Sequence, residues 1–143
     1  MSNVSWINQP GRIRVEQIDE AIRRHIESRF GEHASVTHDT SVTWTVTVDR
    51  VGAVCVIALP DENRITFKGT GDVWDGYIEW FVRTALAVEF HSTCGSEDDP
   101  DESWTPNPSK YPTLETYVRA MRIFGQPPDS EIDFIRSLPE PLR

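Results

Sequence analysis

The sequence is poor in the features that anchor or cross-link a chain. Its 143 residues include only two cysteines, Cys55 and Cys94, which are too few for a disulfide framework. No run approaches the roughly 18 apolar residues that a membrane-spanning helix needs. The opening stretch MSNVSWINQPGRIR also lacks the apolar segment of a secretory signal. These absences predict a cytoplasmic protein with reduced thiols and no membrane partner.

Basic residues are also scarce. The chain has 14 lysines and arginines against 23 aspartates and glutamates, which gives a net charge of −9. Such a field repels phosphate backbones, so we expect no direct nucleic-acid binding. A basic protein partner, a small ligand or a partner without charge remain as candidates. An acidic surface also serves solubility by itself.

Recognisable catalytic motifs are missing as well. The sequence has no G-x-S-x-G and no C-x-x-C, and residues 68–74, KGTGDVW, lack the third glycine of a dinucleotide-binding turn. His91 and Cys94 have a spacing that suits zinc, but no second pair of ligands accompanies them. As a nucleophile, Cys94 would follow a helix C-terminus and precede five acids, and both raise the pKa of a thiol. We therefore expect no catalytic residue, metal or cofactor, and we expect His91, Cys94 and Gly95 to finish a helix.

Hydrophobic periodicity predicts the first elements. Residues 15–30 carry apolar side chains at spacings of three and four, which is typical of an amphipathic helix. Residues 41–48, SVTWTVTV, alternate strictly as in a half-buried strand, with an alternative start near Ala34. Residues 53–59 are apolar on both faces, which indicates a central strand, and residues 64–68 form a third strand after a short turn.

Three further helices are predicted. Residues 73–90 form a long, deeply buried helix with Asp72 as its N-cap. Pro112–Thr113 opens a third helix, and Asp129 or Ser130 caps a short fourth. The inward side chains of the third helix are expected to be Leu114, Tyr117, Val118, Met121 and Phe124.

This order predicts an α+β fold in one domain, residues 1–143. An antiparallel meander of three or four strands is joined by an N-terminal helix, a long buried helix after the sheet and two C-terminal helices. Residues 95–112 are acidic and proline-rich without an apolar period, so we expect a long loop there, and an extended tail at 139–143. The second face of the sheet is covered either by the C-terminal helices or by a partner.

Three acids share one face of the predicted helix 73–90. Asp72, Asp75 and Glu79 are spaced three and four apart, and we expect them to form a solvated capping face. The alternative is a small enzyme in which these carboxylates and His91 hold a divalent metal.

The most distinctive segment is acidic and ends in a tryptophan. Glu97, Asp98, Asp99, Asp101, Glu102 and Trp104 combine charge that steers a basic partner with a ring that anchors it. The alternative is a solvated loop with Trp104 folded back onto the domain.

We therefore predict a non-catalytic, acidic protein-binding module: an inhibitor, immunity or adaptor protein that engages a basic partner protein. Mimicry of nucleic acid is a special case, because clustered carboxylates imitate phosphates. The order helix, meander, helix is similar to that of small secretion-chaperone-like domains and of some bacterial immunity proteins, although no motif residues are shared. The metal-dependent enzyme and a homodimeric structural domain that hides the second sheet face are the alternatives.

Overall fold

The computed structural model describes residues 4–8, 13–70, 72–97, 99–122 and 125–143. Within these residues the fold is α+β, with seven antiparallel strands in the order β2-β3-β4-β5-β1-β6-β7 and four α-helices. The strands are β1 Val4–Asn8, β2 Ala34–Thr40, β3 Thr43–Val48, β4 Gly52–Leu59, β5 Arg64–Lys68, β6 Cys94–Ser96 and β7 Asp99–Trp104. The helices are α1 Val15–Phe30, α2 Val73–Glu89, α3 Leu114–Met121 and α4 Asp129–Ser137.

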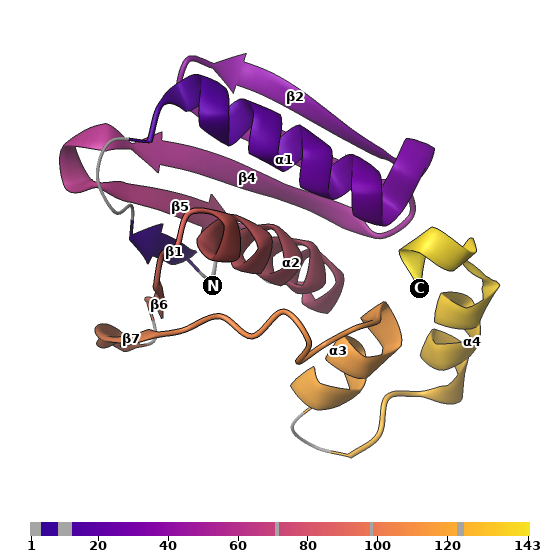
Figure 1. The fold of residues 1–143 in the computed structure, drawn as a ribbon. Coiled ribbons are helices and arrows are strands. Elements are labelled where there is room, and N and C mark those ends of the chain that lie inside the picture. Colours follow the sequence, from indigo (N-terminus) through magenta and orange to yellow (C-terminus); the bar gives the residue numbers. More distant parts are fainter. Residues whose placement is uncertain (1–3, 9–12, 71, 98, 123–124) are drawn as a thin grey trace.

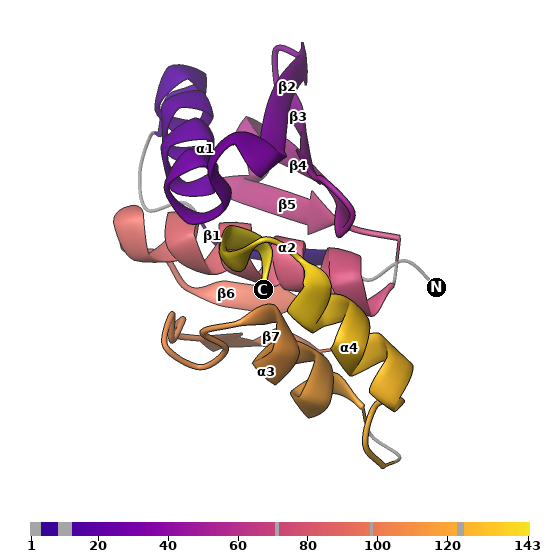
Figure 2. The same ribbon diagram turned by 90° about the vertical axis from the view of Figure 1, so that its right-hand side faces the viewer.

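The helices form a layer on one face of the sheet. α1 and α2 lie side by side across the strands (Figure 1), α3 packs against α2, and α4 packs against α3. Figure 2 shows α1 and α2 on the same side of the strands. None of the described helices is long and apolar enough to cross a bilayer.

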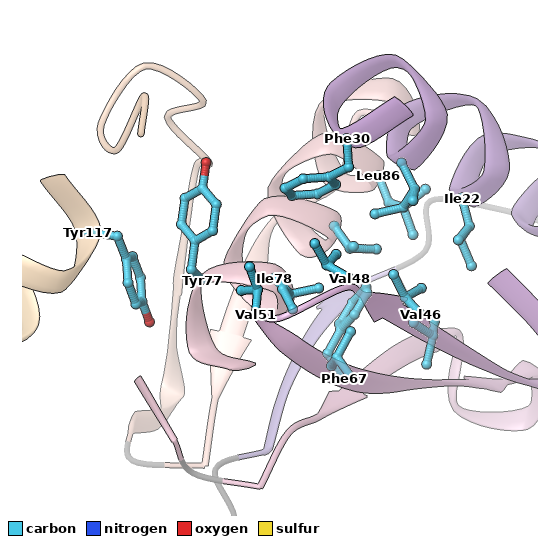
Figure 3. Close-up of a cluster of buried hydrophobic side chains, with 14 of the residues drawn as sticks. Ile22, Phe30, Val46, Val48, Val51, Phe67, Tyr77, Ile78, Leu86 and Tyr117 are labelled. Carbon is cyan, nitrogen blue, oxygen red and sulfur yellow. The ribbon is translucent and has the colours of Figure 1, made fainter. Parts of the chain in front are cut away.

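The core lies between this helix layer and the sheet. On β3, Trp44, Val46 and Val48 are buried while the threonines between them are only half-buried, which confirms the predicted alternation. Figure 3 shows how side chains such as Phe30 of α1 and Leu86 of α2 converge on this face. Each fully buried side chain of this size contributes roughly 1.5–3 kcal/mol through the hydrophobic effect.

The opposite face of the sheet carries no helix in the described part of the chain. Along each strand, the residues of this opposite face alternate with the core residues. The half-buried side chains on it include Trp6, Thr45, Cys55, Ile57 and Leu59. α3 packs against α2 and α4 packs against α3, so the C-terminal helices do not cover this face. A homodimer that covers it stays a prediction.

The α+β class is confirmed, but the prediction of three or four strands is wrong. β2 and β3 are separate strands joined at residues 41–42, whereas we had expected one strand with an alternative start near Ala34. β1 pairs with β5 and β6, which lie far along the chain, so no local pattern marks it. β6 has only three residues, and β7 is acidic and contains a proline, which lowers its intrinsic strand propensity.

The C-terminal predictions need two corrections. Residues 139–143 are not simply extended: Glu140–Leu142 form a 3₁₀ turn, and Leu142 is buried. The carbonyl oxygen of Arg143 accepts a hydrogen bond from the backbone N–H of Leu114 at 3.2 Å, which fixes the end of the chain to α3. Met121, expected to point inward, is 39% exposed, and Phe124 lies outside the described residues.

The predicted cap of α2 is present. Oδ1 of Asp72 accepts a hydrogen bond from the backbone N–H of Trp74 at 2.7 Å. Replacing Asp72 with alanine is expected to lower the free energy of unfolding by about 1 kcal/mol, because one N–H of the first turn loses its acceptor. Denaturant titration measures this loss. The Asp72→Ser variant should retain most of the stability because serine also caps helices; equal losses in both variants would contradict a capping role.

Candidate binding site

The acidic segment forms a hairpin at one edge of the sheet. β6 and β7 pair antiparallel, and β7 is the last strand of the sheet. The expected loop at 95–112 is therefore partly strand, and an edge position tolerates the proline of β7 because one side of the strand has no ladder. The acids exposed on this hairpin are Glu97, Asp99, Asp101 and Glu102, while Asp98 lies outside the described residues.

Negative charge is crowded along β7. A hydrogen bond that protonated Glu102 donates to the neighbouring carboxylate of Asp99, and the negative charge of Asp99, raise the pKa of Glu102 above its usual value. Two carboxylates this close resist ionising together, so one holds a proton more tightly than it would alone. A cation brought to this strand relieves the repulsion and lowers the pKa of Glu102.

Trp104 ends the acidic strand and turns toward α2. It pairs with Cys94 across the ladder, and its ring lies under the guanidinium of Arg83, with 5.6 Å between Cζ and the ring centroid. The side chain is still 37% exposed. Trp104 is thus folded back onto the domain, as the alternative interpretation had it, yet one part of its ring remains open to a partner.

Beside Trp104 lies an ion pair, Glu79–Arg83, that is almost completely enclosed. Nη1 of Arg83 donates to Oε1 of Glu79 at 3.0 Å, and the two side chains are only 11% and 12% exposed. Burial raises the pKa of Glu79 to about 7, although the Arg83 guanidinium acts in the opposite direction. Desolvation of the carboxylate therefore outweighs its attraction to the guanidinium.

Two cavities flank this pair. One, of about 360 Å³, lies between β1, the start of α2 and α3 and is lined by Ser5, Gly76 and Glu79 among others. The second, of about 530 Å³, is lined by the aromatic rings of Trp80, Trp104 and Tyr111. Both cavities are also lined by Arg83, Tyr117 and Met121.

Tyr117 of α3 closes the space beside α2. Its ring meets that of Tyr77 edge-on at 5.6 Å between centroids, and Figure 3 shows the two rings side by side. A Cβ on Gly76 would lie 2.7 Å from the Tyr117 hydroxyl oxygen, so glycine is needed for this approach. Burial and the nearby Glu79 raise the pKa of Tyr117 to about 12, and the phenol therefore stays neutral at ordinary pH.

The prediction of a solvated face for Asp72, Asp75 and Glu79 is wrong for two of the three residues. Asp75 is 7% exposed, and its Oδ1 accepts from the backbone N–H of Ala53 at 2.9 Å, which ties α2 to the start of β4. Glu79 is enclosed with Arg83. No three histidine, cysteine or acidic side chains within the described residues are placed to hold a metal ion, so these acids do not converge with His91.

The end of α2 also differs from the prediction. His91 takes the left-handed conformation, with φ of 52°, and the N–H groups of His91 and Ser92 donate to the carbonyls of Val88 and Ala87. We had expected His91, Cys94 and Gly95 together to finish the helix, but His91 alone among them closes it. Cys94 and Gly95 instead begin β6, where a Cβ on Gly95 would lie 2.5 Å from Nε1 of Trp6.

Cys94 has no features of a nucleophile. Burial raises the pKa of its thiol to about 11; Glu79 adds to this effect, and Arg83 opposes it. We had expected a raised pKa from the helix end and the acids of the following segment. The larger cause is instead desolvation, because Cys94 faces the core opposite Ile7.

Sequence reasoning did not single out Ser5 or Arg83, and it identified Tyr117 only as an inward side chain of the third helix. One local signal was available: Glu79 and Arg83 are four residues apart, with the acid first, on a helix that is otherwise largely apolar. Their enclosure depends on α3 and β7, and it is not visible in the sequence of α2.

No protein-family profile, curated protein or solved structure matches this chain. The features of the chain that bear on its function are the acidic hairpin, the enclosed ion pair and the two cavities.

Proposed function

We propose that the protein is a non-catalytic binding module that accepts a basic, extended segment of a partner protein along β7. The observation that carries this proposal is the position of the acids, which are exposed on a strand at the free edge of the sheet. Among the described residues, the backbone of β7 is hydrogen-bonded on one side only, to β6. An edge of this kind accepts a further strand.

Charge selects which strand is added. Acidic side chains on an edge strand repel a second copy of the same edge and so protect against self-association. The same side chains attract a basic segment, which gains main-chain hydrogen bonds and charge complementarity together. The crowding of Asp99 and Glu102 adds to this preference, because a cation relieves their mutual repulsion.

The end of β7 offers a place for an anchoring side chain. The partly exposed ring of Trp104 borders the cavity of about 530 Å³, which is also lined by Trp80 and Tyr111. Aromatic side chains in such a position commonly dominate the energy of an interface. A partner with an apolar or aromatic residue after its basic stretch would fill this cavity.

The other edge of the sheet suits such a partner less well. β2 pairs only with β3, but its Val36 carbonyl already accepts a hydrogen bond from Nη1 of Arg23 at 2.9 Å. Inhibitor, immunity and adaptor roles all follow from capture of a basic segment at β7. Mimicry of nucleic acid is the case in which the partner's basic surface normally holds phosphates.

Neutralising the hairpin tests this function. The chain serves as bait to isolate its partner, and the affinity of the purified pair is then measured by calorimetry at several salt concentrations. In a variant with Glu97→Gln, Asp99→Asn, Asp101→Asn and Glu102→Gln, the affinity is expected to fall by about tenfold or more, with a weaker dependence on salt.

A matched control removes the same charge elsewhere. Glu16, Glu27, Glu32 and Glu62 are exposed on α1 and on two turns, and all four are changed to glutamine. This variant should bind like the unmodified protein. Unchanged affinity and salt dependence in the hairpin variant would show that β7 is not the interface.

A further inference from the structure

The smaller cavity, beside Glu79, contains polar groups that the protein leaves without partners. Oγ of Ser5 and Nε of Arg83 are buried and form no hydrogen bond within the described residues. Ser5 is 3% exposed, and both residues line this cavity of about 360 Å³. Buried donors without an acceptor are unfavourable and uncommon, so a group that supplies an acceptor here gains free energy.

The chemistry of the vacant positions defines that group. Nε of Arg83 only donates, and the hydroxyl of Ser5 can donate as well. Both therefore match oxygen atoms of a ligand, and a guanidinium favours a carboxylate over a neutral carbonyl. The rest of the wall includes the apolar side chains of Val4, Val73 and Met121, which suit a short hydrocarbon or ring.

Glu79 determines when Arg83 is available to such a ligand. When Glu79 is ionised, Arg83 is already paired with it at 3.0 Å. Burial raises the pKa of Glu79 to about 7, so this carboxyl is readily protonated near neutral pH. A protonated Glu79 leaves the charge of Arg83 uncompensated and adds one more donor to the cavity.

We propose that this cavity binds a small organic carboxylate, whose oxygens are held by Arg83 and Ser5 while Glu79 takes up a proton. The proton comes from solvent. The ligand carboxylate and the protonated Glu79 together then carry one negative charge, which faces the one positive charge of Arg83. This proposal does not depend on the partner proposed above, although Arg83 also lines the cavity that borders Trp104.

Two ionisable side chains near Glu79, those of Tyr117 and Cys94, do not change their protonation near neutral pH. Tyr117 on α3 has a pKa of about 12 and Cys94 on β6 one of about 11, so both remain neutral. At the mouth of the cavity, Arg122 is paired with Glu131 of α4 at 2.5 Å, and Asp72 caps α2.

Titration of the full chain with benzoate, followed by amide chemical shifts, tests the proposal. Benzoate is expected to shift the amides of Ser5, Gly76 and Arg83, and to bind about tenfold more weakly at about pH 8 than at about pH 6, because ionised Glu79 competes for Arg83. Benzamide, which has the same shape without the charge, should bind without this pH dependence.

Substitutions separate this site from non-specific binding. Ser5→Ala should weaken benzoate binding about tenfold, whereas Ser28→Ala, an exposed serine on α1, should not change it. Glu79→Gln should abolish the pH dependence while the chain stays folded. Absence of shifts at these amides, equal binding to Ser5→Ala, or a pH dependence that persists in Glu79→Gln would each overturn the proposal.

Discussion

Replacing Glu79 with glutamine is expected to make the protein more stable than the unmodified chain at neutral pH. The gap in the free energy of unfolding should grow from about zero at pH 4.5 to up to about 3 kcal/mol at neutral pH. The pKa of Glu79 is raised from 4.5 to about 7 in the folded state. The folded state therefore holds this proton more tightly than the unfolded chain, and the protein loses stability as the pH rises from about 4.5 to about 7. The difference between the two values corresponds to about 3 kcal/mol. Glutamine cannot ionise, so the variant keeps this stability.

Denaturant titration of both proteins across this pH range measures the effect. The two curves should coincide at about pH 4.5 and separate as the pH rises, with the variant above. Glu115→Gln serves as the control of opposite sign, because a hydrogen bond from Arg136 lowers the pKa of Glu115, which makes its ionised form stabilising. Parallel curves for the Glu79→Gln variant and the unmodified protein would show that Glu79 titrates normally.

Replacing Arg83 with methionine is expected to make stability fall further at alkaline pH. Without the guanidinium, nothing compensates the buried carboxylate of Glu79, and its pKa rises above 7. The variant should then lose about 1.4 kcal/mol for each pH unit above about 7, a range in which Glu79 no longer affects the stability of the unmodified protein. By about pH 9 the loss reaches roughly 3 kcal/mol.

The double variant Glu79→Gln/Arg83→Met isolates this effect. It lacks both charges and also the contact of Arg83 with Trp104, so it should show no slope from this site. Its stability near neutral pH should exceed that of Arg83→Met, since paired removal of buried charges is often tolerated. A slope in Arg83→Met that survives in the double variant must arise from other groups and would contradict the role assigned to Glu79.

These two predictions have a functional meaning. Ionised Glu79 destabilises the folded state near neutral pH, so a contribution to stability does not explain why the Glu79–Arg83 pair is present. Groups with strongly shifted pKa values beside a cavity are typical of functional sites. This supports the ligand-binding role that we propose for Glu79 and Arg83.

The hydrophobic periodicity of the sequence correctly predicted the elements whose buried face is set by their own residues. The alternation of Trp44, Val46 and Val48 identified the core face of β3, and the apolar stripe of α1 identified its buried side. β1 and β6 are different, because they become strands by long-range pairing: β1 pairs with β5 and β6, and β6 pairs with β1 and β7. A five-residue strand at the chain terminus and a three-residue strand carry too little pattern of their own.

The site was harder to predict for the same reason. Glu79 would be solvated on an isolated α2, but in the folded chain its side chain is only 12% exposed and lines a cavity together with Tyr117 of α3. The acidic segment was singled out from the sequence as distinctive, but its charge and its proline concealed the strand. Only its pairing with β6 places these acids on an edge.

Amide hydrogen exchange of the protein with and without its bound partner tests the central claim most directly. If a basic segment joins the sheet, amides of Asp99–Trp104 on the side away from β6 should exchange much more slowly in the complex. The amides of β2, at the opposite edge, serve as an internal control and should be unchanged. Protection that appears on β2 or elsewhere while β7 exchanges as in the free protein would contradict the account.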